Sequence, residues 1–285
     1  MSYGVNMTTV ATPHGADLTA PAPRHLIVTL FAMYARPENN WLSVASVVRL
    51  MEDLGVDGPS VRSSISRLKR KNILTSVRHD GQAGYSLSQP VLDTINDGDD
   101  RIFGRRRATL DDGWVIAVFS IPESERDKRH ALRTALTRLG FGIAAPGVWI
   151  APAVILDEVR KMLQRNEMEP YVSLFDHCVL TDDAAAKVAS WWNLEELANQ
   201  YTAFLDHYAP LAQDISGEIG TRRAFVEYVP MLTTWRRLPY LDPGLPLQVL
   251  PEGWPGVDAA QLFSEIDASL QPRAREHVQS IVHIS

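Results

Sequence analysis

The sequence has a single cysteine, Cys178, among its 285 residues. One thiol excludes an intrachain disulfide and a zinc site built from several cysteines, and it is compatible with a reducing compartment. The chain also lacks the run of about 18 apolar residues that a membrane-spanning helix requires. Its first residues lack the basic and apolar segments of a secretory signal. These absences predict a soluble, cytoplasmic protein. Cys178 follows His177 on a predicted strand, where neighbouring side chains point to opposite faces, so a buried thiol is expected rather than a nucleophile paired with a base.

Acidic side chains are missing between Gly58 and His79, although the whole chain carries a net charge of -6 and has a pI near 5.8. That overall balance excludes a uniformly basic coat for nucleic acid and leaves only local basic patches. The acid-free segment is such a patch, because it holds the cations Arg62, Arg67, Lys69, Arg70, Lys71 and Arg78. A solvated helix face is the alternative interpretation of such a run of charge.

Apolar periodicity predicts three helices followed by a hairpin in the first third of the chain. A buried helix is expected over residues 24–35, and Ser43 is a candidate cap for the second helix. One face of the third helix carries three apolar residues, Val61, Ile65 and Leu68. Glycines within residues 80–84 predict the hairpin tip, and the helix expected after the hairpin has a predicted turn at Gly98. This arrangement is typical of a winged helix-turn-helix.

Polar residues on the other face of the third helix are the candidate DNA contacts. Phosphates require cations, whereas arginine and serine side chains can bond base edges. The expected base contacts are Ser63, Ser66 and Arg67. The expected phosphate contacts are Arg62, Arg70 and Lys71. On the hairpin, Arg78 and His79 are expected to reach the adjacent backbone or the minor groove. Ser60 completes the predicted DNA-binding set, and a role in solubility is the alternative for each residue.

Composition and periodicity divide the chain into five parts. Residues 1–23 lack periodicity and predict a mobile leader. A winged-helix domain over 24–90 is followed by a linker helix over 91–110. Residues 111–182 show the order βαββαβ, which is the ferredoxin-like topology. Residues 183–285 predict a helical carboxy-terminal domain, so the expected fold class is α+β.

Five strings taken in order resemble the PaaX-type repressors, which control phenylacetate degradation and related aromatic catabolism in bacteria. They begin at Gly58, Gly113, Leu139, Gly147 and Leu250 and run GPSVRSSISRL, GW, LGFG, GVWIAP and LPEGWPG. The resemblance extends from about residue 24 to the last helix. It implies an amino-terminal winged helix, a central ferredoxin-like domain similar to the Cas2 nucleases, and a helical carboxy-terminal domain.

The resemblance also implies a dimeric transcriptional repressor bound to double-stranded operator DNA. An aryl-acyl-CoA ester such as phenylacetyl-CoA is the implied effector that releases it, and no cofactor is implied. Since the family includes regulators of other pathways, the identity of the ester stays open. One departure lies at the start of the third helix, where many winged-helix relatives carry an acidic residue. This chain has Gly58 there, which predicts a different cap.

A CoA ester needs cations for its phosphates and an apolar pocket for its acyl end. The carboxy-terminal domain offers both in the candidate effector residues Arg222, Arg223, Trp235, Arg236, Arg237 and Tyr240. The alternative interpretation places Trp235 in the core and the arginines over a helix face. A dimer would place two recognition helices one or more DNA turns apart on a partly palindromic operator. No heptad pattern forces pairing, so the dimer contacts are expected in the central or carboxy-terminal domain.

Two other functions fit parts of the sequence. The Cas2-like domain suggests a metal-dependent nuclease, but such enzymes place a carboxylate ligand at the end of the first strand. This chain has Phe119 and Ser120 there, with Glu123 beyond them. A pure interaction module would leave the basic, acid-free helix unexplained. Because no nucleotide-binding glycine pattern and no histidine and aspartate metal spacing occurs, the sequence favours regulation over catalysis.

Overall fold

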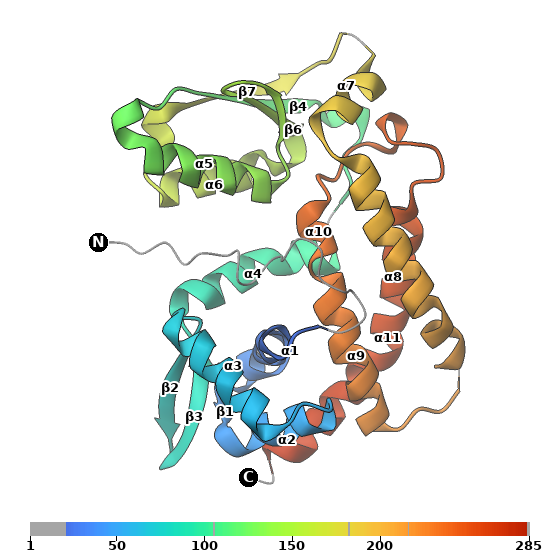
Figure 1. Ribbon diagram of the computed structural model, residues 1–285. Coiled ribbons are helices and arrows are strands. Elements are labelled where there is room, and N and C mark those ends of the chain that lie inside the picture. The colour runs from blue at the N-terminus through green and yellow to red at the C-terminus, as the bar shows by residue number, and fades with distance from the viewer. Residues whose placement is uncertain (1–20, 105, 182, 216, 284–285) are drawn as a thin grey trace. The chain divides into compact units, whose positions relative to one another are not determined.

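The computed structural model describes residues 21–104, 106–181, 183–215 and 217–283 (Figure 1). The predicted mobile leader over 1–23 lies outside these residues except for its last three. The described strands form two antiparallel sheets among many helices, which confirms the α+β class. Within these ranges, no helix combines the length and the apolarity that a bilayer crossing needs.

Backbone contacts divide the chain into two compact units. The first unit combines the described residues up to Phe103 with Ala203–Arg237 and with those from Asp258 onward. The second combines Gly104–Thr202 with Leu238–Val257. Each unit therefore draws on segments that are distant in the sequence, and residues of the predicted carboxy-terminal domain contribute to both.

The first unit begins with three helices and a small sheet. These elements are α1 (Pro23–Leu30), β1 (Leu42–Ser43), α2 (Val44–Asp53), α3 (Gly58–Arg70), β2 (Leu74–His79) and β3 (Gln82–Leu87), with the sheet order β1-β3-β2. Beyond α1 the chain continues as a π-helical turn over Phe31–Ala35. Ser43 caps α2 as predicted, because its Oγ accepts a hydrogen bond from the Ser46 N–H at 3.0 Å.

The predicted hairpin tip over residues 80–84 is wrong in its length. Only Asp80 and Gly81 lie between the strands, and both have positive φ angles, 49° and 83°. Two such residues in sequence form a type I′ turn, whose twist matches that of the flanking strands. Gln82 to Gly84 instead pair with β2, so the hairpin extends further from the helices than the glycine pattern indicated.

The apolar face of α3 packs as its periodicity predicts. Val61, Ile65 and Leu68 are at most 4% exposed, and α3 contacts both α1 and α2. Burying each such side chain contributes about 1.5–3 kcal/mol. The packing therefore fixes the rotation of α3 about its axis and leaves its polar face in solvent.

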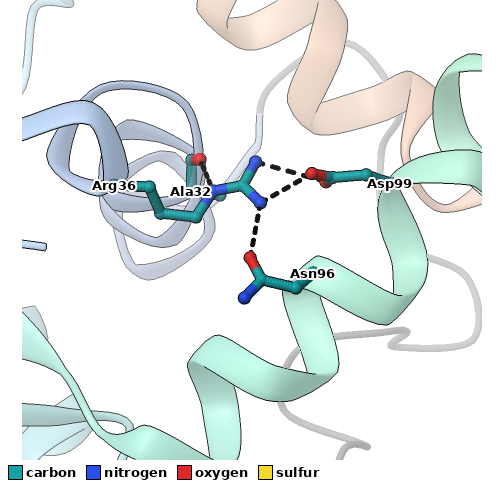
Figure 2. A network of polar contacts seen from close by, with 4 residues as sticks. All are labelled: Ala32, Arg36, Asn96 and Asp99. Atoms are coloured by element: carbon teal, nitrogen blue, oxygen red, sulfur yellow. Dashed lines mark hydrogen bonds and ion pairs between the residues drawn. The ribbon is translucent and has the colours of Figure 1, made fainter.

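After the hairpin, the chain continues as one helix, α4 (Gln89–Phe103). The turn predicted at Gly98 is wrong, because Gly98 is buried within this helix. Figure 2 shows how α4 is held: Arg36 Nη1 donates to Asn96 Oδ1 at 2.9 Å and pairs with Asp99 Oδ2 at 2.6 Å. The contacts of Arg36 with Asn96 and Asp99 thus support a continuous helix where Gly98 alone would favour a turn.

Three long helices of the carboxy-terminal part contribute to the first unit. They are α8 (Leu194–Asp214), α9 (Thr221–Trp235) and α11 (Pro255–Val282). The rings of Trp235 and Phe263 stack at 4.5 Å, and Phe204 lies 5.2 Å from Trp235. Helix α9 also packs on α1, where Thr233 Oγ1 donates to Thr29 Oγ1 at 2.8 Å. The amino-terminal helices and these helices therefore share one core.

The second unit is built on the predicted βαββαβ order, which the structure confirms. Its elements are β4 (Trp114–Phe119), α5 (Arg126–Leu139), β5 (Gly142–Ala145), β6 (Val148–Pro152), α6 (Leu156–Arg165) and β7 (Val172–Cys178). The sheet order is β5-β6-β4-β7, with antiparallel neighbours. Both helices lie on one face of the sheet (Figure 1). Cys178 is half-buried, so the prediction of a fully buried thiol is wrong.

Two shorter helices complete the second unit, α7 (Ala184–Trp191) and α10 (Leu238–Leu241). Asp242 follows α10 and is almost completely buried. Its Oδ2 accepts hydrogen bonds from Arg107 Nη2 at 2.7 Å and from the Tyr201 hydroxyl at 2.9 Å, and its Oδ1 accepts one from the Gly244 N–H at 2.6 Å. Burial alone would raise the pKa of Asp242, but the Arg107 charge and these hydrogen bonds hold the pKa below its ordinary value.

We expect this carboxylate to make the stability of the chain depend on acidity. Because the folded-state pKa of Asp242 lies below the ordinary value of 3.8, its contribution is fully present above that value and is lost as the pH falls through the folded-state pKa. Urea unfolding at a series of pH values from about 6 to about 3 measures this loss. The Asp242→Asn variant should be less stable at neutral pH and should lose less on acidification. Parallel pH profiles for the two proteins would contradict the prediction.

Candidate nucleic-acid interface

The first turn of α3 is capped by a residue that the sequence analysis missed. Asp57 accepts hydrogen bonds from the Ser60 N–H and from the Ser60 hydroxyl, both at 2.8 Å. Gly58 and Pro59 lie inside the helix, and these bonds hold the pKa of Asp57 below its ordinary range. The helix therefore has an ordinary acidic cap, which corrects the expectation of a different one. The signal was present, since aspartate is a preferred cap and proline is favoured in the first helical turn.

The face of α3 opposite its buried residues is exposed and basic. Its exposed members are Arg62, Ser63, Ser66, Arg67 and Arg70. Within the described ranges, no ion pair joins a carboxylate to an arginine of this face, although the charge of Arg62 helps to lower the pKa of Asp57. The guanidinium groups are thus available to an anionic partner, and the serines between them leave room for a close approach. Ser60, in contrast, is half-buried and its hydroxyl proton is used in the cap.

The hairpin lies beside α3 (Figure 1), and two more predicted residues on it, Arg78 and His79, are exposed. Arg78 Nη1 donates to the Gly81 carbonyl at 3.1 Å, which holds the side chain close to the turn. His79 Nδ1 lies 3.1 Å from an oxygen of Asp80, and both side chains are exposed. Lys71 follows α3 as its cap residue and is exposed. Eight of the nine predicted DNA contacts are therefore exposed residues of α3, of its cap or of the adjacent hairpin.

The second helix of this module is anchored at its last residue. Asp53 accepts a hydrogen bond from Arg222 Nε at 2.7 Å, and its other oxygen lies 2.8 Å from His277 Nε2. Partial burial alone would raise the pKa of Asp53, but the hydrogen bonds from Arg222 and His277 hold it below its ordinary value. Helices α9 and α11 thus fix the end of α2, on which α3 packs.

The predicted effector residues are distributed along α9 and beyond it. Arg222 pairs with Asp53, and Arg223 pairs with Asp214. Trp235, thirteen residues after Arg222, is buried, and its Nε1 donates to the Ile102 carbonyl at 3.0 Å. At a rise of 1.5 Å per residue, helix α9 separates Arg222 from Trp235 by roughly 20 Å along its axis. The structure therefore does not bring all six residues into one compact pocket.

The remaining predicted effector residues follow the end of α9. Arg236 Nη1 donates to Thr29 Oγ1 at 3.2 Å. Arg237 is half-buried, and burial lowers its pKa. Tyr240 is also half-buried and belongs to the second unit. An effector role for these residues stays a prediction.

A metal-dependent nuclease would need a cluster of ligands. In the described part of the chain, no group of three or more histidine, cysteine, aspartate or glutamate residues is placed to hold a metal ion. At the end of β4, Arg129 pairs with Glu123 at 2.8 Å and donates to the Ile121 carbonyl at 2.6 Å. The first acidic residue after that strand, Glu123, is therefore paired with an arginine.

Comparison with known families covers most of the chain. A model described as PaaX-like protein matches residues 22–91, the PaaX protein central Cas2-like domain matches residues 107–189, and the PaaX-like protein C-terminal domain matches residues 192–280. The chain belongs to the PaaX-type repressor family. The exposed face of α3 and the hairpin lie within the first of these matches, and the βαββαβ sheet lies within the second.

Two relatives are similar to this chain over most of its length. The Transcriptional repressor PaaX of Escherichia coli (strain K12) is 26% identical over 271 residues, which cover 92% of this chain and 84% of that protein. The solved structure of the uncharacterized protein Rv0674 from Mycobacterium tuberculosis matches with a TM-score of 0.58 and 21% identity, covering 92% of this chain and all of that one. The second likeness supports the fold of this PaaX-family chain.

Proposed function

We propose that the chain is a transcriptional repressor whose α2, α3 and β2–β3 hairpin form a winged helix-turn-helix that binds operator DNA. The observation that carries the proposal is the exposed face of α3, which is basic, free of acidic side chains and fixed in orientation by the buried opposite face. A recognition helix of this kind enters the major groove, while a wing contacts the neighbouring backbone or minor groove. Kinship with the Escherichia coli repressor supports regulation rather than catalysis.

The residues of this face divide by chemistry. Arg67, Ser63 and Ser66 lie where side chains can bond base edges, and arginine pairs bidentately with guanine. Phosphate neutralisation falls to Arg62, Arg70 and Lys71, since each phosphate contact displaces bound counterions and strengthens binding at low salt. Arg78 and His79 extend the contact from the hairpin. The net negative charge of the whole chain confines the interaction to this patch.

The family resemblance supports three further parts of the proposal. The chain acts in the bacterial cytoplasm as a homodimer on a partly palindromic operator. It represses an operon of aromatic or acyl-CoA catabolism. An aryl-acyl-CoA ester such as phenylacetyl-CoA releases it by binding more tightly to a DNA-incompetent state, because an effector shifts an equilibrium only through such a difference.

Gel-shift titration of the purified full chain against the DNA upstream of its own coding sequence tests the proposal. We expect a specific complex whose affinity falls with salt, with a slope in log units of about -0.9 for each phosphate contact. A panel of aryl- and alkyl-CoA esters should contain one class that releases the DNA. Binding that does not distinguish this DNA from a scrambled duplex would contradict DNA recognition. Specific binding that no ester reverses would contradict only the proposed release by an acyl-CoA ester.

A further inference from the structure

The outer part of the β2–β3 hairpin has little packing of its own. From Ser76 onward every residue of β2 is exposed, and so are the first two residues of β3. Gly84 is the exception, because it is buried although it has no side chain. The residue that covers it is Trp41, which directly precedes β1.

The Trp41 indole touches both strands of the hairpin. A Cβ atom placed on Gly84 would lie 2.4 Å from Cε2 and Nε1 of the indole and 2.5 Å from the Leu42 carbonyl oxygen. The indole Nε1 donates to the Val77 carbonyl at 3.3 Å, and its ring lies 5.5 Å from that of His79. Only glycine at position 84 leaves room for this arrangement.

Strand alternation places the Trp41 contact and the Arg78 side chain on opposite faces of the hairpin. Val77 pairs with Gly84 in register, and cross-strand partners share a face of the sheet. Arg78, the next residue, therefore projects from the opposite face. That face also carries Leu74, which is 1% exposed, and β2 contacts α3. Trp41 thus supports the hairpin on one face while Arg78 projects from the face nearer to α3.

We propose that Trp41 is a positioning residue for DNA binding: it holds the hairpin at the angle at which Arg78 meets the DNA backbone. The inference rests on the proposed function, since it needs the hairpin to act as a wing. Trp41 carries no charge, so its effect on DNA is transmitted through Arg78. The same contact requires Gly84, because any side chain there would displace the indole or the Leu42 carbonyl.

The salt dependence of operator binding distinguishes positioning from general stability. Removing one phosphate contact by Arg78→Ala should weaken binding and reduce the salt slope by about 1. Trp41→Ala should reduce the slope by about the same amount although it removes no charge, and it should weaken binding about tenfold. The double variant should bind like either single variant, because coupled residues are not additive. Gel-shift titrations at several salt concentrations with the full chain provide both readouts.

Each outcome has a distinct meaning. A wild-type chain that binds no specific DNA would overturn the proposed function itself. If Arg78→Ala changes the slope and Trp41→Ala leaves it unchanged, or if the two losses multiply, the positioning role of Trp41 is wrong while the proposed function stands. If Trp41→Ala does not fold, Trp41→Phe replaces it, because this variant keeps a ring over Gly84 but loses the hydrogen bond to the Val77 carbonyl. We expect Trp41→Phe to lose less affinity than Arg78→Ala and to show a correspondingly smaller reduction of the salt slope. An unchanged slope in Trp41→Phe, with or without a loss of affinity, would overturn the inference.

Discussion

Arg67→Ala is expected to weaken sequence-specific operator binding much more than non-specific DNA binding. A bidentate contact between an arginine and a guanine contributes about 1–3 kcal/mol of discrimination, so the specific affinity should fall by about 5- to 150-fold. Binding to non-specific DNA should fall much less, because it depends on the summed phosphate contacts. Competition titrations with the operator and a scrambled duplex measure the two affinities separately.

Two variants of α3 serve as controls for this prediction. Arg67→Lys keeps the charge but loses the bidentate fork, so it should retain non-specific affinity and lose specificity. Lys69→Ala removes an equal charge two residues along, where the side chain is rotated by about 200° around the helix. It should leave the specificity ratio nearly unchanged. Equal losses on operator and scrambled DNA in Arg67→Ala would assign Arg67 to a phosphate contact instead.

The sequence was sufficient for the parts of the fold that local periodicity determines. The apolar spacing in α3 correctly placed Val61, Ile65 and Leu68 in the core, and Ser43 was correctly identified as a cap. The order βαββαβ followed from alternating strand and helix patterns in the same way. Such features depend on neighbours within a few residues, which a sequence displays directly.

Features that depend on contacts between distant residues leave no local signal in the sequence. Gly98 predicted a turn, but the bonds from Arg36 to Asn96 and Asp99 hold α4 continuous across it. The glycine at position 84 suggested a longer tip, whereas it makes room for Trp41. A glycine can therefore either form a turn or make room for a close side-chain contact within a strand, and only the tertiary structure distinguishes these two roles.

The candidate effector residues show the same limit on a larger scale. Arginines and a tryptophan that are close in sequence met the chemical needs of a CoA ester. The structure instead pairs Arg222 with Asp53 at the end of α2 and buries Trp235 against Phe263. Both contacts join segments far apart in the chain, so composition could not separate a ligand site from an internal anchor.

Trp235→Ala is expected to lower the free energy of unfolding by about 3–5 kcal/mol, the range found when a large buried aromatic side chain is truncated. Trp235 is 5% exposed, stacks on Phe263 and donates to the Ile102 carbonyl, so truncation leaves a cavity and an unpaired carbonyl. Urea unfolding followed by circular dichroism measures the loss. Trp191→Ala is the matched control, because Trp191 is half-buried and its truncation should cost less. A Trp235→Ala loss no greater than the Trp191→Ala loss would contradict a core role.

A stability loss of this size decides how any effector experiment on Trp235 is interpreted. Release of DNA by an ester could fail in Trp235→Ala simply because the shared core of α9 and α11 has loosened. Trp235→Phe reduces this ambiguity, since it keeps an aromatic ring against Phe263 and removes the indole N–H together with the second, fused ring. Normal ester release by Trp235→Phe would place Trp235 in the core alone. Lost release with an unchanged unfolding free energy would show that the same indole also contacts the effector.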